Sequence, residues 1–122
     1  MTTRMGILAL ALMMASGSAM AGEADVVDVA VRKTSGGAYD FDVTIRSNDT
    51  GWEHYADAFE VLAPDGSVLG QRILLHPHTN EQPFTRDLYG VAIPSGITQV
   101  TVRARHKPKG YDGATMTVDL PH

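Results

Sequence analysis

The chain contains no cysteine among its 122 residues. No disulfide can therefore stabilise its fold, and redox or metal chemistry that needs a thiolate is excluded, copper(I) sites built on thiolates among them. Because no cysteine follows the small residues near the N-terminus, we also expect no lipid anchor of the kind attached to bacterial lipoproteins.

Long apolar segments are also lacking. The most apolar one, Met5 to Ala15, is too short to cross about 30 Å of hydrocarbon, which takes roughly 20 residues. It follows the cationic Arg4 and leads to the small residues of Ala19-Met20-Ala21, the A-x-A pattern of a signal peptidase site. We therefore expect residues 1–21 to be a cleaved signal peptide and residues 22–122 to form a single domain. The protein is then periplasmic or secreted, with no membrane insertion after cleavage.

The mature chain lacks an excess of positive charge. Loss of residues 1–21 removes Arg4 and no acidic residue, so the formal charge moves from −4 to −5. A mildly acidic chain lacks the excess of positive charge with which proteins bind nucleic acid. Only Met116 of the six methionines remains, and the mature chain begins with Gly22 rather than histidine. These features argue against a methionine-rich copper carrier and against a copper enzyme that uses an N-terminal histidine.

The dominant pattern is alternation of apolar and polar residues with a period of two, and no window has a clear helical period. The Gly36-Gly37 pair and the Ala63–Gly66 segment separate alternating runs in the manner of hairpin turns. About seven short strands within roughly 100 residues predict an all-β fold, an antiparallel two-sheet sandwich of the immunoglobulin/fibronectin-like type. The runs lie near residues 27–31, 39–45, 55–61, 68–75, 88–92, 98–106 and 116–120.

Two segments are less regular. Phe84 to Ala92 is predicted to hold one short strand near Leu88–Ala92, after a crossover between the sheets in which Phe84 fills the core. Trp52, just before the third strand, suits either the conserved core position of an immunoglobulin-like domain or ordinary core packing. With no cysteine pair, a disulfide-pinned immunoglobulin domain is excluded, and fibronectin-like and cupredoxin-like sandwiches remain open.

Four of the five histidines lie at predicted strand ends. His54 opens the third strand, His76 and His78 follow the fourth, and His106 ends the strand that starts at Thr98. If the third strand pairs antiparallel with both the fourth and the sixth, all four imidazoles reach one end of the sandwich. We then expect His54 to lie near His76 and His78.

Clustered imidazoles suit zinc or copper(II). His76 and His78 are two residues apart in an extended segment, so both rings can face one side, roughly 6.6 Å apart. Nearby carboxylates that could complete such a site are Glu53, Asp57 and Glu81. Imidazole ligands must be neutral, so binding should weaken below about pH 6.5. The sequence thus predicts a site for copper(II) or zinc made by His54, His76, His78 and His106.

Other readings of the same residues stay open. The histidines can be loop residues that hydrogen-bond their own loops, and His106 is in phase with Val102 and Ala104, as an edge-of-core residue would be. The same end of the sandwich can instead bind a periplasmic protein partner without metal. No nucleophile elbow, phosphate loop or zinc-protease motif is present, so we expect no enzyme unless a bound metal activates water.

Three segments resemble a family of small exported bacterial proteins that has no assigned activity. They are Gly51-Trp52-Glu53-His54-Tyr55-Ala56-Asp57, Leu75-His76-Pro77-His78 and Glu81-Gln82-Pro83-Phe84-Thr85-Arg86. The resemblance extends to the Gly110–Gly113 loop. It implies export, and it implies no substrate, cofactor or site.

The predicted cleavage site gives a direct test. The exported protein should have the mass of residues 22–122 and an N-terminal Gly22, because the small side chains of Ala19 and Ala21 fit the peptidase. Intact mass spectrometry of the purified protein measures this, and a mature chain that keeps Met5 to Ala15 would contradict it.

Overall fold

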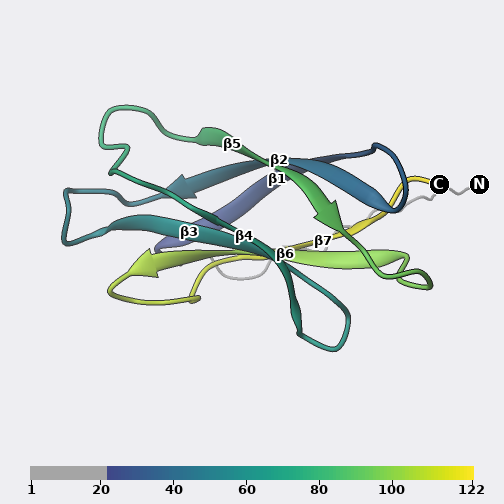
Figure 1. The fold of residues 1–122 in the computed structure, drawn as a ribbon. Helices are drawn as coiled ribbons and strands as arrows, with labels where there is room; N and C mark the ends of the chain where they lie inside the picture. The colour runs from purple at the N-terminus through teal and green to yellow at the C-terminus, as the bar shows by residue number, and fades with distance from the viewer. Residues whose placement is uncertain (1–21) are drawn as a thin grey trace, which may run out of the picture.

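The computed structural model describes residues 22–122, and the predicted signal peptide, residues 1–21, lies outside the described residues. Seven strands form two antiparallel sheets that lie face to face (Figure 1). One sheet has the order β1-β2-β5 and the other β4-β3-β6-β7, which confirms the predicted immunoglobulin/fibronectin-like sandwich. The strands are β1 (Ala24–Lys33), β2 (Ala38–Ser47), β3 (Tyr55–Leu62), β4 (Val68–Ile73), β5 (Phe84–Ala92), β6 (Gln99–Lys107) and β7 (Met116–Asp119).

The core lies between the sheets and is built by the alternation seen in the sequence. Phe41, Val43 and Ile45 of β2 are fully buried, and so is Phe59 at the middle of β3. Alternate residues of a strand point to opposite faces, so one face of each strand supplies the apolar layer. None of residues 22–122 forms a helix long and apolar enough to cross a membrane.

Both predicted hairpins are present. Between β1 and β2, Gly36 and Gly37 have φ values of 58° and 85°, which side chains with a Cβ rarely adopt. Between β3 and β4, the amide of Gly66 donates to the carbonyl of Ala63 at 2.9 Å, and Gly66 has a φ of 90°. These turns bring β2 back beside β1 and β4 back beside β3.

Strand β5 is longer than predicted, because it begins at Phe84 rather than near Leu88. Phe84 pairs with Ile45 and is buried in the core, as the sequence led us to expect. The pairing of β2 with β5 shifts register between Tyr39 and Phe41, and Gly90 has a φ of 69°. This irregularity breaks the alternation of apolar and polar residues, so the alternation does not reveal the full length of the strand.

Trp52 is not a core residue, which corrects the expectation. It is 62% exposed and lies in the turn before β3, while Phe59 within that strand fills the core. The turn carries the Trp52 ring away from the space between the sheets.

One end of the sandwich gathers the starts of β1, β3 and β5 and the ends of β2, β4 and β6. The pairs Ala24–Ser47 and Tyr55–Lys107 mark this end, which we call the histidine end. Residues 74–83 connect β4 of one sheet to β5 of the other sheet at this end (Figure 1).

The N-terminal segment, residues 22–25, docks on the loop that joins β6 to β7. The amide of Val26 donates to the carbonyl of Ala114 at 2.9 Å, and the amide of Ala114 donates to a carboxylate oxygen of Asp25 at 2.7 Å. A Cβ added at Gly113 would collide with the carbonyl oxygen of Ala24. The close approach of the two backbones therefore requires glycine at position 113.

The docking of this segment can be tested by Gly113→Ala. The added methyl group has no space against the backbone of Ala24, so the free energy of unfolding should fall by roughly 1–3 kcal/mol. Gly70→Ala is the matched control, because the nearest atoms to its methyl group are side-chain ends, with Leu88 Cδ2 at 3.1 Å. Urea unfolding measures both variants, and an equal loss in the two would contradict the tight docking.

Candidate functional site

The four histidines named from the sequence all lie at the histidine end, but they form two pairs. The rings of His54 and His106 have centroids 6.2 Å apart, and those of His76 and His78 are 4.8 Å apart. Within residues 22–122 no ring contact joins the pairs, and no group of three or more His, Asp or Glu side chains is arranged to hold a metal ion. The structure therefore does not bring the predicted four-histidine set to one point.

A buried carboxylate, Asp49, accepts hydrogen bonds from residues next to both pairs. Asp49, in the loop after β2, accepts hydrogen bonds at Oδ1 from the Ser47 hydroxyl at 2.6 Å and from the Ala56 amide at 3.0 Å. Its Oδ2 accepts from the amide of His78 at 2.8 Å. Asp49 thus links the crossover segment to the end of β2 and the start of β3. It also holds the backbone amide of His78 against a buried group.

The His78 ring is held from several sides. It is only 6% exposed and stacks on Phe84 with centroids 3.9 Å apart. Arg86 donates from Nη2 to Nε2 of His78 at 2.9 Å, so the neutral ring carries its proton on Nδ1, which lies 3.9 Å from Oδ2 of Asp49. His78 is therefore not a surface loop histidine: its Nε2 is bonded to Arg86 of β5, and its Nδ1 has no hydrogen-bond partner among residues 22–122.

The environment of His78 disfavours its protonation. Burial lowers the pKa of His78, and the positive charges of Arg86 and His76 lower that pKa further. The carboxylates of Asp49 and Glu81 act in the opposite direction and are the weaker influence. The ring is thus kept neutral under conditions where an exposed imidazole would start to charge.

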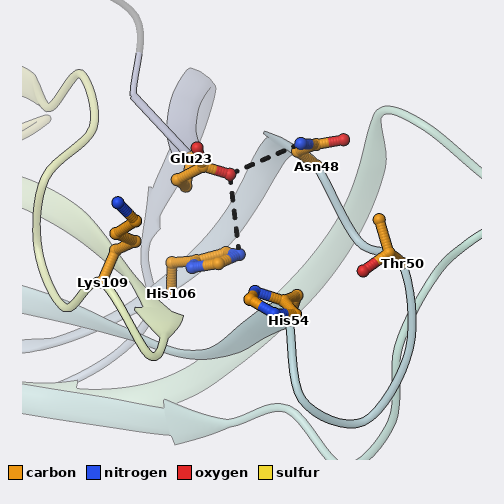
Figure 2. Close-up of a pocket in the computed structure, with 6 residues that line it drawn as sticks. All are labelled: Glu23, Asn48, Thr50, His54, His106 and Lys109. Atoms are coloured by element: carbon orange, nitrogen blue, oxygen red, sulfur yellow. Dashed lines mark hydrogen bonds and ion pairs between the residues drawn. The ribbon is translucent and has the colours of Figure 1, made fainter.

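His106 has a different environment. It lies on the same core-facing side of β6 as Val102 and Ala104, as expected, and is 2% exposed. Neither ring nitrogen has a hydrogen-bond partner among residues 22–122. Nε2 lies 3.9 Å from Oε1 of Glu23 (Figure 2). A buried imidazole without partners is uncommon, because it loses its bonds to water and gains none in return.

His54 lies beside His106 on an exposed turn. The amide of His54 donates to the carbonyl of Gly51 at 3.1 Å, and the amide of Thr50 donates to the carbonyl of His54 at 2.9 Å. These bonds close the turn that follows Asp49 and set the imidazole next to that of His106 (Figure 2). The turn therefore fixes the backbone of His54, and its side chain is exposed.

Glu23 comes from the docked N-terminal segment. Its carbonyl accepts from the amide of Asn48 at 2.9 Å, and its amide donates to Asp112 at 3.2 Å. The Asn48 side chain also donates to Oε1 of Glu23 at 3.5 Å. Glu23 and Asn48 border an open pocket of about 320 Å³, which is lined by Glu23, Asn48, Thr50, His54, His106 and Lys109.

The sequence analysis missed Glu23 and named other carboxylates. Asp57 is engaged by Arg105 at 2.9 Å, and Glu81 lies 3.6 Å from Arg86. The signal for Glu23 was available, because it immediately precedes β1. An antiparallel first hairpin returns the end of β2 beside the start of β1, which is the histidine end.

No family model matches the chain, and no solved structure matches it. A protein of Halomicrobium mukohataei named "Putative lipoprotein" is 42% identical over 97 residues, which cover 80% of this chain and 47% of that protein. The chain thus spans about half the length of this relative. The relative's name agrees with the export predicted from residues 1–21, although this chain contains no cysteine to which a lipid could be attached.

The lowered pKa of His78 predicts a pH-dependent stability. On acidification the unfolded chain, whose histidine pKa is about 6.5, takes up the proton before the folded chain does. This contribution to the free energy of unfolding is therefore complete above about pH 6.5 and is lost as the pH falls from there toward the folded-state pKa. Urea unfolding between about pH 7.5 and pH 5 should show the loss.

His78→Asn should make the stability less dependent on pH over that range, because the titrating group is gone. His122→Asn, which changes an exposed terminal histidine, is the matched control and should keep the slope of the wild-type protein. A His78→Asn slope as steep as that of the wild-type would contradict the assignment.

Proposed function

We propose that this protein is an exported β-sandwich that binds a divalent transition metal, zinc or copper(II), in the pocket of Glu23, His54 and His106. The observation that carries the proposal is the buried His106 ring, whose two nitrogens have no hydrogen-bond partner among residues 22–122. Leaving a buried polar group unsatisfied costs about 1–3 kcal/mol. A metal ion bound at Nε2 would remove part of that cost and would occupy the pocket beside the ring.

The proposal requires side chains to move, because no group of three or more His, Asp or Glu side chains among residues 22–122 is already arranged to hold a metal ion. Zinc lies about 2.0–2.1 Å from a histidine nitrogen and 2.0–2.2 Å from a carboxylate oxygen. The 3.9 Å between His106 Nε2 and Glu23 Oε1 is slightly too long for a tetrahedral ion between them. The Glu23 side chain is 35% exposed and His54 is exposed, so both can move toward the fixed ring of His106.

Two imidazoles and one carboxylate form a ligand set that suits zinc and copper(II). His76 and His78 provide no ligand in this proposal, because Nε2 of His78 already accepts from Arg86. Carriage, buffering or sensing of the metal are the roles that fit a small exported protein. Periplasmic or secreted location follows from the predicted signal peptide and is supported by the name of the relative.

A second candidate is a metal-free module that binds a periplasmic protein through the same end. It is supported by two apolar side chains there, Trp52 and Leu75, which are 62% and 74% exposed. Pull-down from periplasmic extract with the wild-type protein and with Trp52→Ser/Leu75→Ser tests it. Loss of a specific captured protein in the double variant would favour this candidate.

Calorimetric titration of zinc and of copper(II) into the untagged protein tests the metal site. Glu23→Gln and His54→Ala should each weaken binding by about tenfold or more, because each removes one of few ligands. His106→Gln should weaken it further. His76→Ala is the matched control, an exposed histidine of the other pair, and should bind as the wild-type protein does.

The opposite pattern would overturn the proposal. If His76→Ala weakens binding while His54→Ala does not, the metal is held by the His76–His78 pair. Millimolar binding that is the same in all variants would leave no metal site in the pocket. Circular dichroism of each variant shows whether it keeps the fold, and the exposed positions of His54 and His76 make them the decisive pair.

A further inference from the structure

We propose that removal of the predicted signal peptide strengthens the fold, because the new α-ammonium group of Gly22 pairs with the buried carboxylate of Asp25. The inference is independent of the proposed metal site. Its basis is the docked N-terminal segment, where the backbone nitrogen of Gly22 donates to Oδ1 of Asp25 at 2.8 Å. In the uncut chain this nitrogen is a neutral amide, whereas in a chain that begins with Gly22 it carries a positive charge.

The first argument is the state of the carboxylate. Asp25 is only 8% exposed, and a charged side chain so deeply buried is usually paired. Among residues 22–122 no Lys, Arg or His side chain forms an ion pair with Asp25. Arg46 is its register partner in β2 but is exposed to solvent. A positive partner for Asp25 is therefore still to be supplied, and cleavage before Gly22 supplies one.

The second argument is that the terminus is already held in place. A Cβ added at Gly22 would collide with the carbonyl oxygen of Asp112 and would lie 2.6 Å from the Cα of Gly113. On the other side, a Cβ added at Gly113 would lie 2.8 Å from Oδ1 of Asp25. The backbone of Gly22 thus fits between this loop and the carboxylate, so an ammonium group at its nitrogen can pair without a rearrangement.

The third argument is the change in chemistry at one atom. A backbone amide has one hydrogen to donate and no charge, whereas an ammonium group has three and a full positive charge. Hydrogen bonds between charged partners are roughly twice as strong as those between neutral ones. An α-amino group is mostly protonated at pH 7. The carboxylates of Glu23 and Asp112 add negative charge close to this terminus, and Arg46 acts in the opposite direction.

The pair would make the peptidase cut a switch for the stability of the molecule. Cutting changes the charge at one point, and the docking of the first strand on the loop between β6 and β7 responds to it. The amide of Ala114 in that loop also donates to Oδ1 of Asp25, at 2.7 Å, so one oxygen joins the terminus to the loop. The exported chain therefore gains stability at the step that frees it from its signal peptide.

The test compares the chain that begins with Gly22 with a chain that keeps Ala21 in front of it. Both are made from a cleavable fusion that leaves no other residue. The extension turns the nitrogen of Gly22 back into a neutral amide and moves the charge by one residue, about 3.8 Å. Urea unfolding at pH 7 should show an unfolding equilibrium constant about tenfold larger for the extended chain, because a charge-assisted hydrogen bond becomes a neutral one.

Acetylation of the Gly22 amine removes the charge without adding a residue and should have the same effect. Sodium chloride at about 0.5 M should shrink the difference between the free and acetylated chains, because salt screens a partly exposed pair. Crowding at the terminus would not respond to salt in this way. This comparison needs no substitution, so it decides the matter even if a variant fails to fold.

Asp25→Asn separates charge from crowding in a second way. It keeps the size of the side chain and an oxygen that can accept from Ala114. In this variant the extension should change the unfolding constant by less than about twofold, since no carboxylate remains to couple with the amine. Asp112→Asn is the matched control, because Asp112 is an exposed acid of the same loop, and there the extension should still cost about tenfold.

Three results would overturn the inference. The first is an extension that destabilises the wild-type protein and Asp25→Asn equally, since its effect would then be crowding. The second is a free and an acetylated chain of equal stability. The third is an exported protein that begins at another residue, because no amine would then lie beside Asp25. None of these results bears on metal binding, which is measured separately.

Discussion

The histidine end is organised by the buried carboxylate of Asp49. Its two oxygens accept three hydrogen bonds, from the Ser47 hydroxyl and from the amides of Ala56 and His78. Hydrogen bonds to a charged group contribute about 1.5–3 kcal/mol each. They join the end of β2 in one sheet, the start of β3 in the other sheet, and the crossover segment. His54 lies on the turn after Asp49, and His76 and His78 lie on the crossover, so three of the four histidines take their positions from this junction, whereas His106 belongs to β6.

The two buried histidines at this end, His78 and His106, differ in their hydrogen bonding because their surroundings differ. His78 stacks on an aromatic ring and has a guanidinium bonded to Nε2, which leaves only Nδ1 without a hydrogen-bond partner among residues 22–122. His106 is equally buried but has no partner for either nitrogen among the described residues. A residue whose hydrogen bonds are satisfied stabilises structure, whereas one left unsatisfied in a pocket is available to a ligand.

Much of the fold could be predicted from alternation and turn residues, because one buried face per strand imposes a period of two. Strand β5 was read as too short where a register shift and Gly90 break that period. The strand order also placed all four histidines at one end. It could not show that Asp49 would be buried or that the rings would form two separate pairs, since an aspartate in a turn is ordinarily solvated. Glu23 was overlooked because its side chain belongs to the pocket only through docking of residues 22–25.

That docking has a consequence for how the molecule meets its neighbours. Strand β1 is an outer strand of its sheet, and such strands present unpaired amides and carbonyls to any passing chain. Here the amide of Val26 is occupied by Ala114, and the register of β1 shifts between Val26 and Asp28. The loop from the far end of the sequence thus covers the first part of this edge. The amide of Val26 is thereby withheld from edge-to-edge pairing with another chain.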